Sequence, residues 1–174
     1  MPDTVGLRHV RDSDLEFLQA LYADSRSVEF AALQLEEAAL QALLSMQFQA
    51  QRAQYRQRHP DSVDYIVTLD AADVGRCWVN SSDAGIRILD IAVLTRFRRQ
   101  GVASRVIREF GAKAASGGRP MRLSVWHDNA AAIALYRTLG FQFHGEHNGY
   151  HELEWPAVAG DRRSLVSQEA ATHE

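Results

Sequence analysis

The sequence has very few cysteines and no long hydrophobic run. Cys77 is the only cysteine, so an internal disulfide and a cysteine-based metal cluster within one chain are both excluded. No window approaches the roughly 18 apolar residues of a membrane span. The first residues, 1–4, show no basic region followed by an apolar stretch, as a secretory leader would have. We therefore expect a cytoplasmic protein with no membrane partner.

An excess of basic charge is also missing. Nineteen Lys and Arg face 22 Asp and Glu, which gives a formal net charge of -3, so a nucleic-acid partner is not expected. A content of 46% hydrophobic and 24% charged residues is ordinary for a globular domain. Beyond residue 156 the chain is short of large apolar residues. We predict a single domain over residues 1–156 and a polar, mobile tail over 157–174.

The most informative stretch is a basic turn that contains a glycine. An apolar run over residues 86–94 predicts a buried strand, and Val102, Val106 and Phe110 recur at helical spacing after it. The turn over residues 98–103 therefore lies at a helix N-terminus, where free N–H groups and the helix dipole suit an oxyanion. Gly101 allows a phosphate to approach closely. A solvated turn remains the alternative, and the turn fits neither the P-loop nor the dinucleotide fingerprint.

Other patterns give the order of the remaining elements. Ser13 and Glu16 predict a capping box for a first helix. Glutamines and Tyr55 in the second helix could face a substrate, but a solvated helix face is favoured. Asn148-Gly149 predicts a hairpin near the end of the domain. The expected strands are 6–11, 65–69, 74–80, 86–94, 121–126, 141–146 and 150–155, with further helices over 35–59, from Val102 onward and over 129–140. This order predicts an α/β (α+β) domain of three layers.

A second motif begins at Asn129, which is expected to cap a short helix that Gly140 ends. Tyr136 lies seven residues after Asn129, so the two fall on similar sides of that helix. Alanines between them leave room for a ligand or for another backbone.

Together these two motifs resemble those of the GNAT superfamily of acyl-CoA-dependent N-acyltransferases. Arg98-x-x-Gly101-x-Ala103 looks like the pyrophosphate motif of that family. The segment from Asn129 through Ala132 and Leu135-Tyr136 to Gly140-Phe141 looks like its second cofactor segment. The sequence departs from the family pattern at two positions, with Ala103 where a glycine is commoner and Thr95 where a proline is frequent.

The resemblance implies a mixed, mostly antiparallel sheet of six to seven strands with helices on both faces. The sheet would be splayed between the fourth and fifth strands, 86–94 and 121–126, with acetyl-CoA in the gap as the acyl donor and no metal. The cofactor-binding residues that the resemblance implies are Ile91, Ala92, Val93, Arg98, Arg99, Gln100, Gly101, Val102, Ala103, Ser104, Asn129, Ala132 and Tyr136.

The implied chemistry is direct attack of a neutral amine on the thioester, which needs a proton acceptor and a donor for the thiolate. Tyr136 fits the donor, with a purely structural core aromatic as the alternative. Asp90, an acid inside an apolar strand, would have a raised pKa if buried and could be the base. A structural hydrogen-bond acceptor is the other interpretation of Asp90.

Other functions are weaker fits. His144, His147 and His151 with Glu152 lie across a hairpin that would scatter them, so a metal site is not expected. Ser124, His127 and Asp128 are too close along one strand end for a hydrolase triad. Two alternatives to the small-molecule acetyltransferase stay open: a catalytically inactive acyl-CoA-binding or regulatory domain, and a protein N-terminal or lysine acetyltransferase. A homodimer is left open, and the expected walls of the acceptor pocket are Tyr22, Gln47, Gln51, Trp78, Trp126, His147 and Tyr150.

Overall fold

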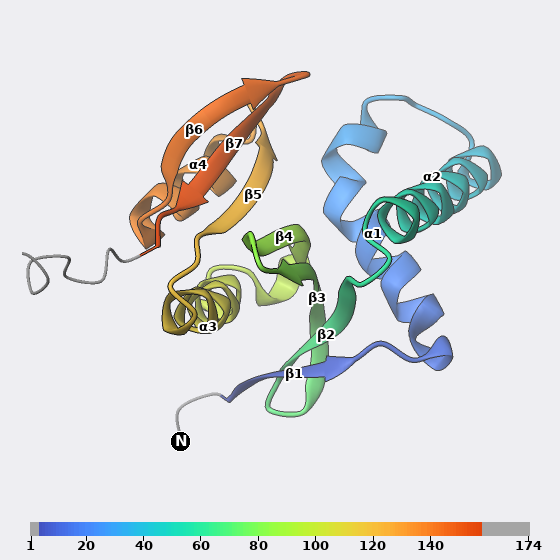
Figure 1. The fold of residues 1–174 in the computed structure, drawn as a ribbon. Helices are drawn as coiled ribbons and strands as arrows, with labels where there is room; N and C mark the ends of the chain where they lie inside the picture. Colours follow the sequence, from blue (N-terminus) through green and yellow to red (C-terminus); the bar gives the residue numbers. More distant parts are fainter. Residues whose placement is uncertain (1–3, 158–174) are drawn as a thin grey trace, which may run out of the picture.

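The computed structural model describes residues 4–157, which form a seven-stranded sheet in the order β1-β2-β3-β4-β5-β7-β6 (Figure 1). All neighbouring strands are antiparallel except the pair β4 and β5. The strands are β1 Val5–His9, β2 Val63–Leu69, β3 Ala72–Ser82, β4 Gly85–Val93, β5 Met121–Trp126, β6 Gln142–His147 and β7 Tyr150–Trp155. The helices are α1 Leu15–Ala31, α2 Glu37–Arg58, α3 Val102–Ser116 and α4 Ala130–Leu139, with short 3-10 turns η1 Asp12–Asp14 and η2 Thr95–Phe97. The tail predicted from residue 157 lies, apart from Ala157, outside the described residues.

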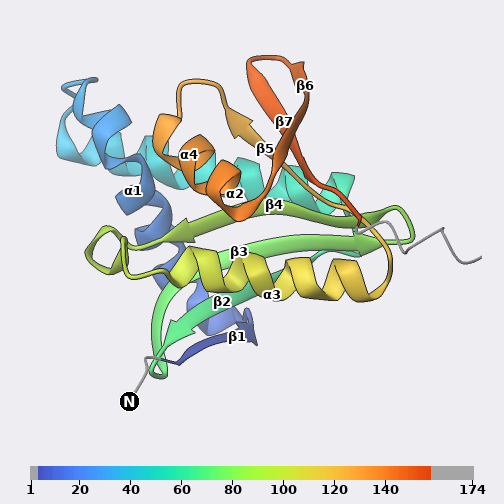
Figure 2. The same cartoon turned by 90° about the vertical axis from the view of Figure 1, so that its left-hand side faces the viewer.

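Helices cover both faces of the sheet, because two sets of apolar side chains are buried there. One set joins α1 and α2 to Ile66 of β2, and the other joins α3 and α4 to the opposite face of the sheet. Figure 2 shows α3 in the foreground of the sheet and α2 in its background. The predicted three-layer fold class is therefore confirmed.

The sheet opens between β4 and β5. Their parallel ladder has three residue pairs, from Ile86 opposite Met121 to Ile88 opposite Leu123. Beyond these pairs β5 turns away from β4 and continues alongside β7, as both ribbon views show. One edge of β4 beyond Ile88 is left without a neighbouring strand among the described residues. This is the splay that the family resemblance implied.

A β-bulge fixes how the residues of β4 face. Trp78 of β3 lies opposite Asp90, whereas the next residue, Val79, lies opposite Ile88. Leu89 is therefore the extra residue, and the bulge places Asp90 on the face of β3 and β4 that α1 and α2 cover. A strict alternation from Ile88 could not give this orientation.

Two turns differ in detail from the sequence prediction. The turn between β2 and β3 is tighter than predicted, with Asp70 and Ala71 both at positive φ, 48° and 68°. The predicted capping box at Ser13 is wrong, because Asp14 takes the N-cap position of α1. The Asp14 carboxylate instead accepts hydrogen bonds from the Arg11 backbone N–H at 2.7 Å and from Arg8 at 2.8 and 2.9 Å.

This ion pair predicts acid-sensitive stability. The Arg8 guanidinium lowers the pKa of the Asp14 carboxyl from 3.8 to about 2. A carboxyl group whose pKa is lower in the folded state stabilises the fold at pH values above its unfolded pKa. This stabilisation, about 2 kcal/mol, disappears as the pH falls from about 4 to about 2. Urea unfolding of Asp14→Asn should show this loss already at neutral pH. Asp12→Asn, at an exposed position in the same turn, is the matched control and should unfold like the wild type; equal stability of both variants would contradict the assignment.

Candidate active site

The splay of the sheet leads into a cleft of about 980 Å³. Helices α1 and α2 form one wall, β4 forms the floor, and β5, β7 and the start of α4 form the other wall. Its lining residues are Ser25, Arg26, Val28, Glu29, Gln51, Tyr55, Ile88, Leu89, Asp90, Ile91, Leu123, Ser124, Val125, Trp126, Asp128, Asn129, Tyr136 and Tyr150. The predicted residues Asp90, Ile91, Asn129 and Tyr136 therefore share one cavity, although they come from two separate segments, β4 and α4 with its N-cap.

The basic turn adopts a conformation that only a few residue types tolerate. Gly101 is the N-cap of α3 with φ of 76°, in the left-handed region, and Arg99 also has a positive φ of 65°. An added Cβ at Gly101 would meet no atom within 4 Å, so the space beside this turn is open. Val102 is buried in the core. The backbone N–H groups of the first turn of α3 point along the helix axis, out of its N-terminal end, where they lack partners within the helix.

Side chains of this turn bond to the end of β4 and to η2. The Arg98 Nε donates to the Val93 carbonyl at 2.9 Å, and Gln100 Nε2 donates to the Arg96 carbonyl at 3.2 Å. The Val93 carbonyl therefore already has one donor. The Ala92 carbonyl faces β3, close to Gly75, so Ile91 is the best placed of the three predicted backbone groups of β4. Ala103 packs against the core and Ser104 is half-buried, which leaves their N–H groups as their contribution to an anion site.

Asn129 caps α4 as the sequence predicts. Its Oδ1 accepts a hydrogen bond from the Ala132 backbone N–H at 3.1 Å, and Gly140 ends the helix with φ of 104°. Within residues 4–157 the side-chain NH2 of Asn129 has no partner, and Asn129 lines the cleft. The amide N–H groups are therefore the part of Asn129 that can reach a bound molecule.

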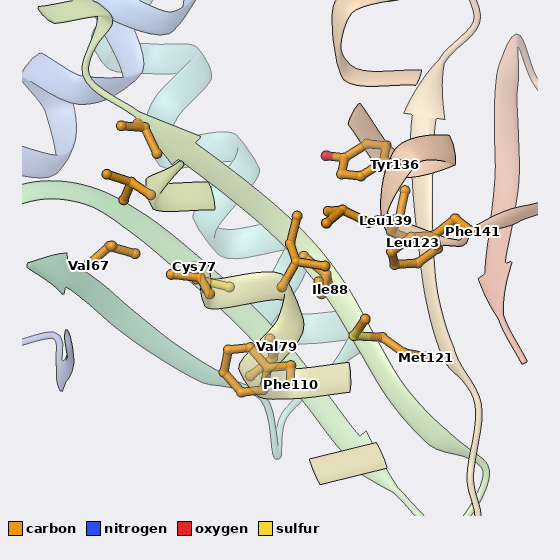
Figure 3. Close-up of a cluster of buried hydrophobic side chains, with 14 of the residues drawn as sticks. Val67, Cys77, Val79, Ile88, Phe110, Met121, Leu123, Tyr136, Leu139 and Phe141 are labelled. Carbon is orange, nitrogen blue, oxygen red and sulfur yellow. The ribbon is translucent and has the colours of Figure 1, made fainter. Parts of the chain in front are cut away.

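Tyr136 is buried, with 8% of its surface exposed, and its ring packs edge-on against Phe141 at 5.7 Å between ring centroids. Figure 3 shows the hydroxyl directed away from the apolar cluster and toward the side of β4. Burial, with the Asp90 carboxylate as a further cause, raises the pKa of the Tyr136 hydroxyl above its ordinary value. The hydroxyl therefore stays protonated and is available as a donor.

Asp90 is held at the floor of the cleft by a charged network. Arg76, itself 3% exposed, makes a bidentate pair with Asp64 at 2.7 Å for each contact, and its Nη1 lies 3.6 Å from the Asp90 carboxylate. Asp90 keeps 26% of its side chain exposed to the cleft. Burial raises the pKa of Asp90, and Asp64 adds to this, although Arg76 and Arg26 oppose it. A carboxylate with a raised pKa is a stronger proton acceptor than an ordinary aspartate.

A comparison with known protein families identifies the family to which this domain belongs. Residues 61–143, from β2 through the basic turn and α4 to Phe143, match the model of the acetyltransferase (GNAT) domain. This chain carries a GNAT acetyltransferase domain. A comparison with curated protein sequences gives no match.

Solved structures share the fold of this GNAT domain. The PaiA N-acetyltransferase of Thermoplasma acidophilum, in complex with coenzyme A, has a TM-score of 0.67 and 14% identity over 88% of this chain and 99% of its own. An acetyltransferase from Thermus thermophilus has a TM-score of 0.66 and 18% identity over 88% of this chain and 97% of its own. The ribosomal-protein-S18-alanine N-acetyltransferase of Escherichia coli has a TM-score of 0.57 and 18% identity over 91% of this chain and 98% of its own. At these identities the likeness shows the fold alone.

Several residues of the GNAT domain were assigned incompletely from the sequence. Among the predicted pocket walls, Gln51, Trp126 and Tyr150 line the cleft, whereas Trp78 is buried beneath it. Tyr22 lines a smaller recess next to Asp90. Neither Gln47, which accepts a hydrogen bond from Tyr22, nor His147, on the hairpin of β6 and β7, is among the cleft-lining residues.

The favoured interpretation of α2 as a solvated face is wrong for Gln51 and Tyr55, which both line the cleft. Sequence reasoning missed Arg26 and Glu29 of α1 altogether. Their spacing of four and seven residues from Tyr22 places all three on one helix face, which is the signal that could have found them.

The residues considered for a hydrolase triad do not form one, because Ser124 bonds to Glu152 and not to His127. Arg87 donates to both Ser124 and Glu152 at 2.8 and 2.7 Å. His127 lies 2.8 Å from Asp128 at the rim. Among residues 4–157 no group of three or more histidine, cysteine or acidic side chains is arranged to hold a metal ion, and no helix is long and apolar enough to cross a membrane.

Proposed function

We propose that this GNAT domain transfers the acetyl group of acetyl-CoA to the primary amine of a small molecule. The observation that carries the proposal is that Asp90 and Tyr136, a proton acceptor and a proton donor, line one cleft along the unpaired edge of β4. The cleft has walls of α1 and α2 on one side and of β5 and β7 on the other, which suits a small acceptor better than a folded protein surface.

The donor would lie across the splay with its pyrophosphate at the N-terminus of α3. Backbone N–H groups at Val102, Ala103 and Ser104 would bind the phosphate oxygens, supported by the helix dipole and by the exposed Arg99. The pantetheine arm would follow the unpaired edge of β4 at Ile91 and reach the amide of Asn129. This path brings the thioester between Asp90 and Tyr136.

The reaction follows from these positions. The neutral amine nitrogen attacks the thioester carbonyl and forms the new C–N bond, while the Asp90 carboxylate accepts the proton that the nitrogen loses. The C–S bond then breaks, and the Tyr136 hydroxyl donates its hydrogen bond and proton to the departing thiolate. The products are the N-acetylated amine and coenzyme A, and the proton held by Asp90 returns through water to Tyr136.

The proposal is tested by following the acetyl group itself. Purified protein is incubated with acetyl-CoA carrying a heavy-isotope acetyl label and with pools of small primary amines, and the amines are analysed by mass spectrometry. Label in an amine product, absent when the protein is omitted, is the expected result. Binding of acetyl-CoA with no label in any amine would favour the binding-only domain, and label in a protein or peptide alone would favour a macromolecular acceptor.

The role of Asp90 predicts a pH dependence. Protonation of the amine already lowers kcat/KM as the pH falls. The Asp90 carboxylate accepts a proton only when deprotonated, so below its raised pKa kcat/KM should show an additional proton dependence. Asp90→Asn should lower kcat/KM about a hundredfold and remove this additional dependence. Asp128→Asn, at the exposed rim of the same cleft, is the matched control and should keep it. An additional proton dependence that persists in Asp90→Asn would exclude Asp90 as the base.

A further inference from the structure

The part of the cleft under α1 and α2, which we call the acceptor chamber, has a distinct chemical character. It is lined by Arg26 and Glu29 of α1, Gln51 of α2, Asp90 of β4, Trp126 of β5 and Tyr150 of β7. Each of these groups either accepts hydrogen bonds, attracts a cation or is already paired. The chemistry of the chamber therefore restricts which amine can bind there as the acceptor.

The one cation that lines the chamber is already engaged. Arg26 Nη1 lies 3.0 Å from the Glu29 carboxylate, and the Arg26 guanidinium lies over the ring of Tyr22 at 5.2 Å from its centroid. The positive charge of Arg26 is thus balanced within α1. A carboxylate on the acceptor would have to compete with Glu29 for it.

Two hydrogen-bonding groups of the chamber are acceptors, the Asp90 carboxylate and the Gln51 side-chain carbonyl. Arg76 is shared by two carboxylates, with Asp64 at 2.7 Å and Asp90 more distant at 3.6 Å. The Oε1 of Gln51 is buried and has no partner among residues 4–157. Gln51 and Asp90 also line the same small recess of about 50 Å³ beside the cleft. A buried acceptor without a partner costs free energy unless a ligand supplies an N–H donor.

Aromatic rings complete the chamber opposite α1. Trp126 and Tyr150 contact each other edge to face at 5.2 Å between ring centroids, and each keeps 45% of its surface exposed. The face of an aromatic ring attracts an ammonium group and repels an anion. Both rings line the same cleft as the Asp90 carboxylate.

We infer that the acceptor is a cationic amine that carries no carboxylate on the carbon bearing the reactive nitrogen. An ammonium or amide N–H finds the Gln51 carbonyl, the Asp90 carboxylate and two ring faces, whereas a carboxylate finds two acidic groups and a cation already paired. This inference rests on the proposed acetyl transfer and names the substrate class of the same site.

The test compares acceptors that differ by one group. The compounds are phenylalanine, phenylalaninamide and phenethylamine, together with tyrosine, tyrosinamide and tyramine, each assayed for kcat/KM with acetyl-CoA. In each series we expect the amide and the carboxylate-free amine to exceed the free amino acid by about tenfold or more, the size of one unfavourable charge contact. An amino acid used as well as its amine would overturn the inference and leave acetyl transfer intact. Transfer to none of the six, despite acetyl-CoA binding, would count against both proposals.

A variant of α1 tests the role of the paired cation. Glu29→Gln frees Arg26 to meet a carboxylate, so the preference for the amine over the amino acid should fall about three- to fivefold, the range expected for one exposed ion pair. Glu16→Gln, exposed at the start of the same helix, is the matched control and should keep the wild-type preference. An unchanged preference in Glu29→Gln would contradict the account of Arg26.

Discussion

Tyr136→Phe is expected to lower kcat about a hundredfold while the affinity for coenzyme A stays nearly unchanged. The substitution removes the hydroxyl alone, because phenylalanine keeps the ring contact with Phe141. Loss of the proton donor should raise the barrier to thiolate departure without changing the binding of the pyrophosphate at α3. Steady-state kinetics with an accepted amine, together with calorimetric titration of coenzyme A, measures both quantities.

The control for this experiment is Tyr65→Phe. Tyr65 packs against Phe110 on the α3 side of the sheet and is not among the residues that line the cleft. Both variants remove one tyrosine hydroxyl, so a similar kcat in Tyr136→Phe and Tyr65→Phe would show that the Tyr136 hydroxyl has only a structural role. A large loss of coenzyme A affinity in Tyr136→Phe would also contradict its assignment to the leaving group.

Gly101→Val is expected to weaken coenzyme A binding by tenfold or more. A β-branched residue resists the left-handed conformation that Gly101 has at φ of 76°, at a cost of about 1 to 3 kcal/mol. Relief of this strain reorients the N–H groups at the start of α3, and the new side chain occupies the open space beside the turn. Each 1.4 kcal/mol lost is a tenfold loss of affinity.

The opposite end of α3 supplies a matched control. Gly118 has φ of 63°, and an added Cβ there would also meet no atom within 4 Å. Gly118→Val therefore introduces the same kind of strain far along the chain from the basic turn. We expect both variants to lose thermal stability and only Gly101→Val to lose affinity for coenzyme A. Equal affinities in the two variants would exclude this turn as the phosphate site.

Local sequence signals predicted most of the fold. Asn148-Gly149 forms the tight hairpin expected of it, with φ of 50° and 80°. Asn129 and Gly140 bound α4 as predicted, and β5 spans the predicted residues, Met121–Trp126. These features depend on backbone chemistry within a few residues, which a single sequence displays directly.

The site was less predictable because it depends on contacts between distant segments. The orientation of Asp90 is set by the bulge at Leu89, and a bulge has no reliable signature in a run of apolar residues. Ser13 lost the N-cap position because Asp14 meets Arg8 of β1, a tertiary contact that outweighs local capping preference. Arg26 and Glu29 look like ordinary exposed helix residues until α1 is placed beside β4.

The most direct test of the account is the release of free thiol from acetyl-CoA, measured with and without small amines for the wild type, Tyr136→Phe and Asp90→Asn. The account predicts amine-dependent release by the wild type and a loss of about a hundredfold in each variant, with coenzyme A still bound. Amine-dependent release that is unchanged in both variants would show that acetyl transfer does not use the cleft between β4 and β5.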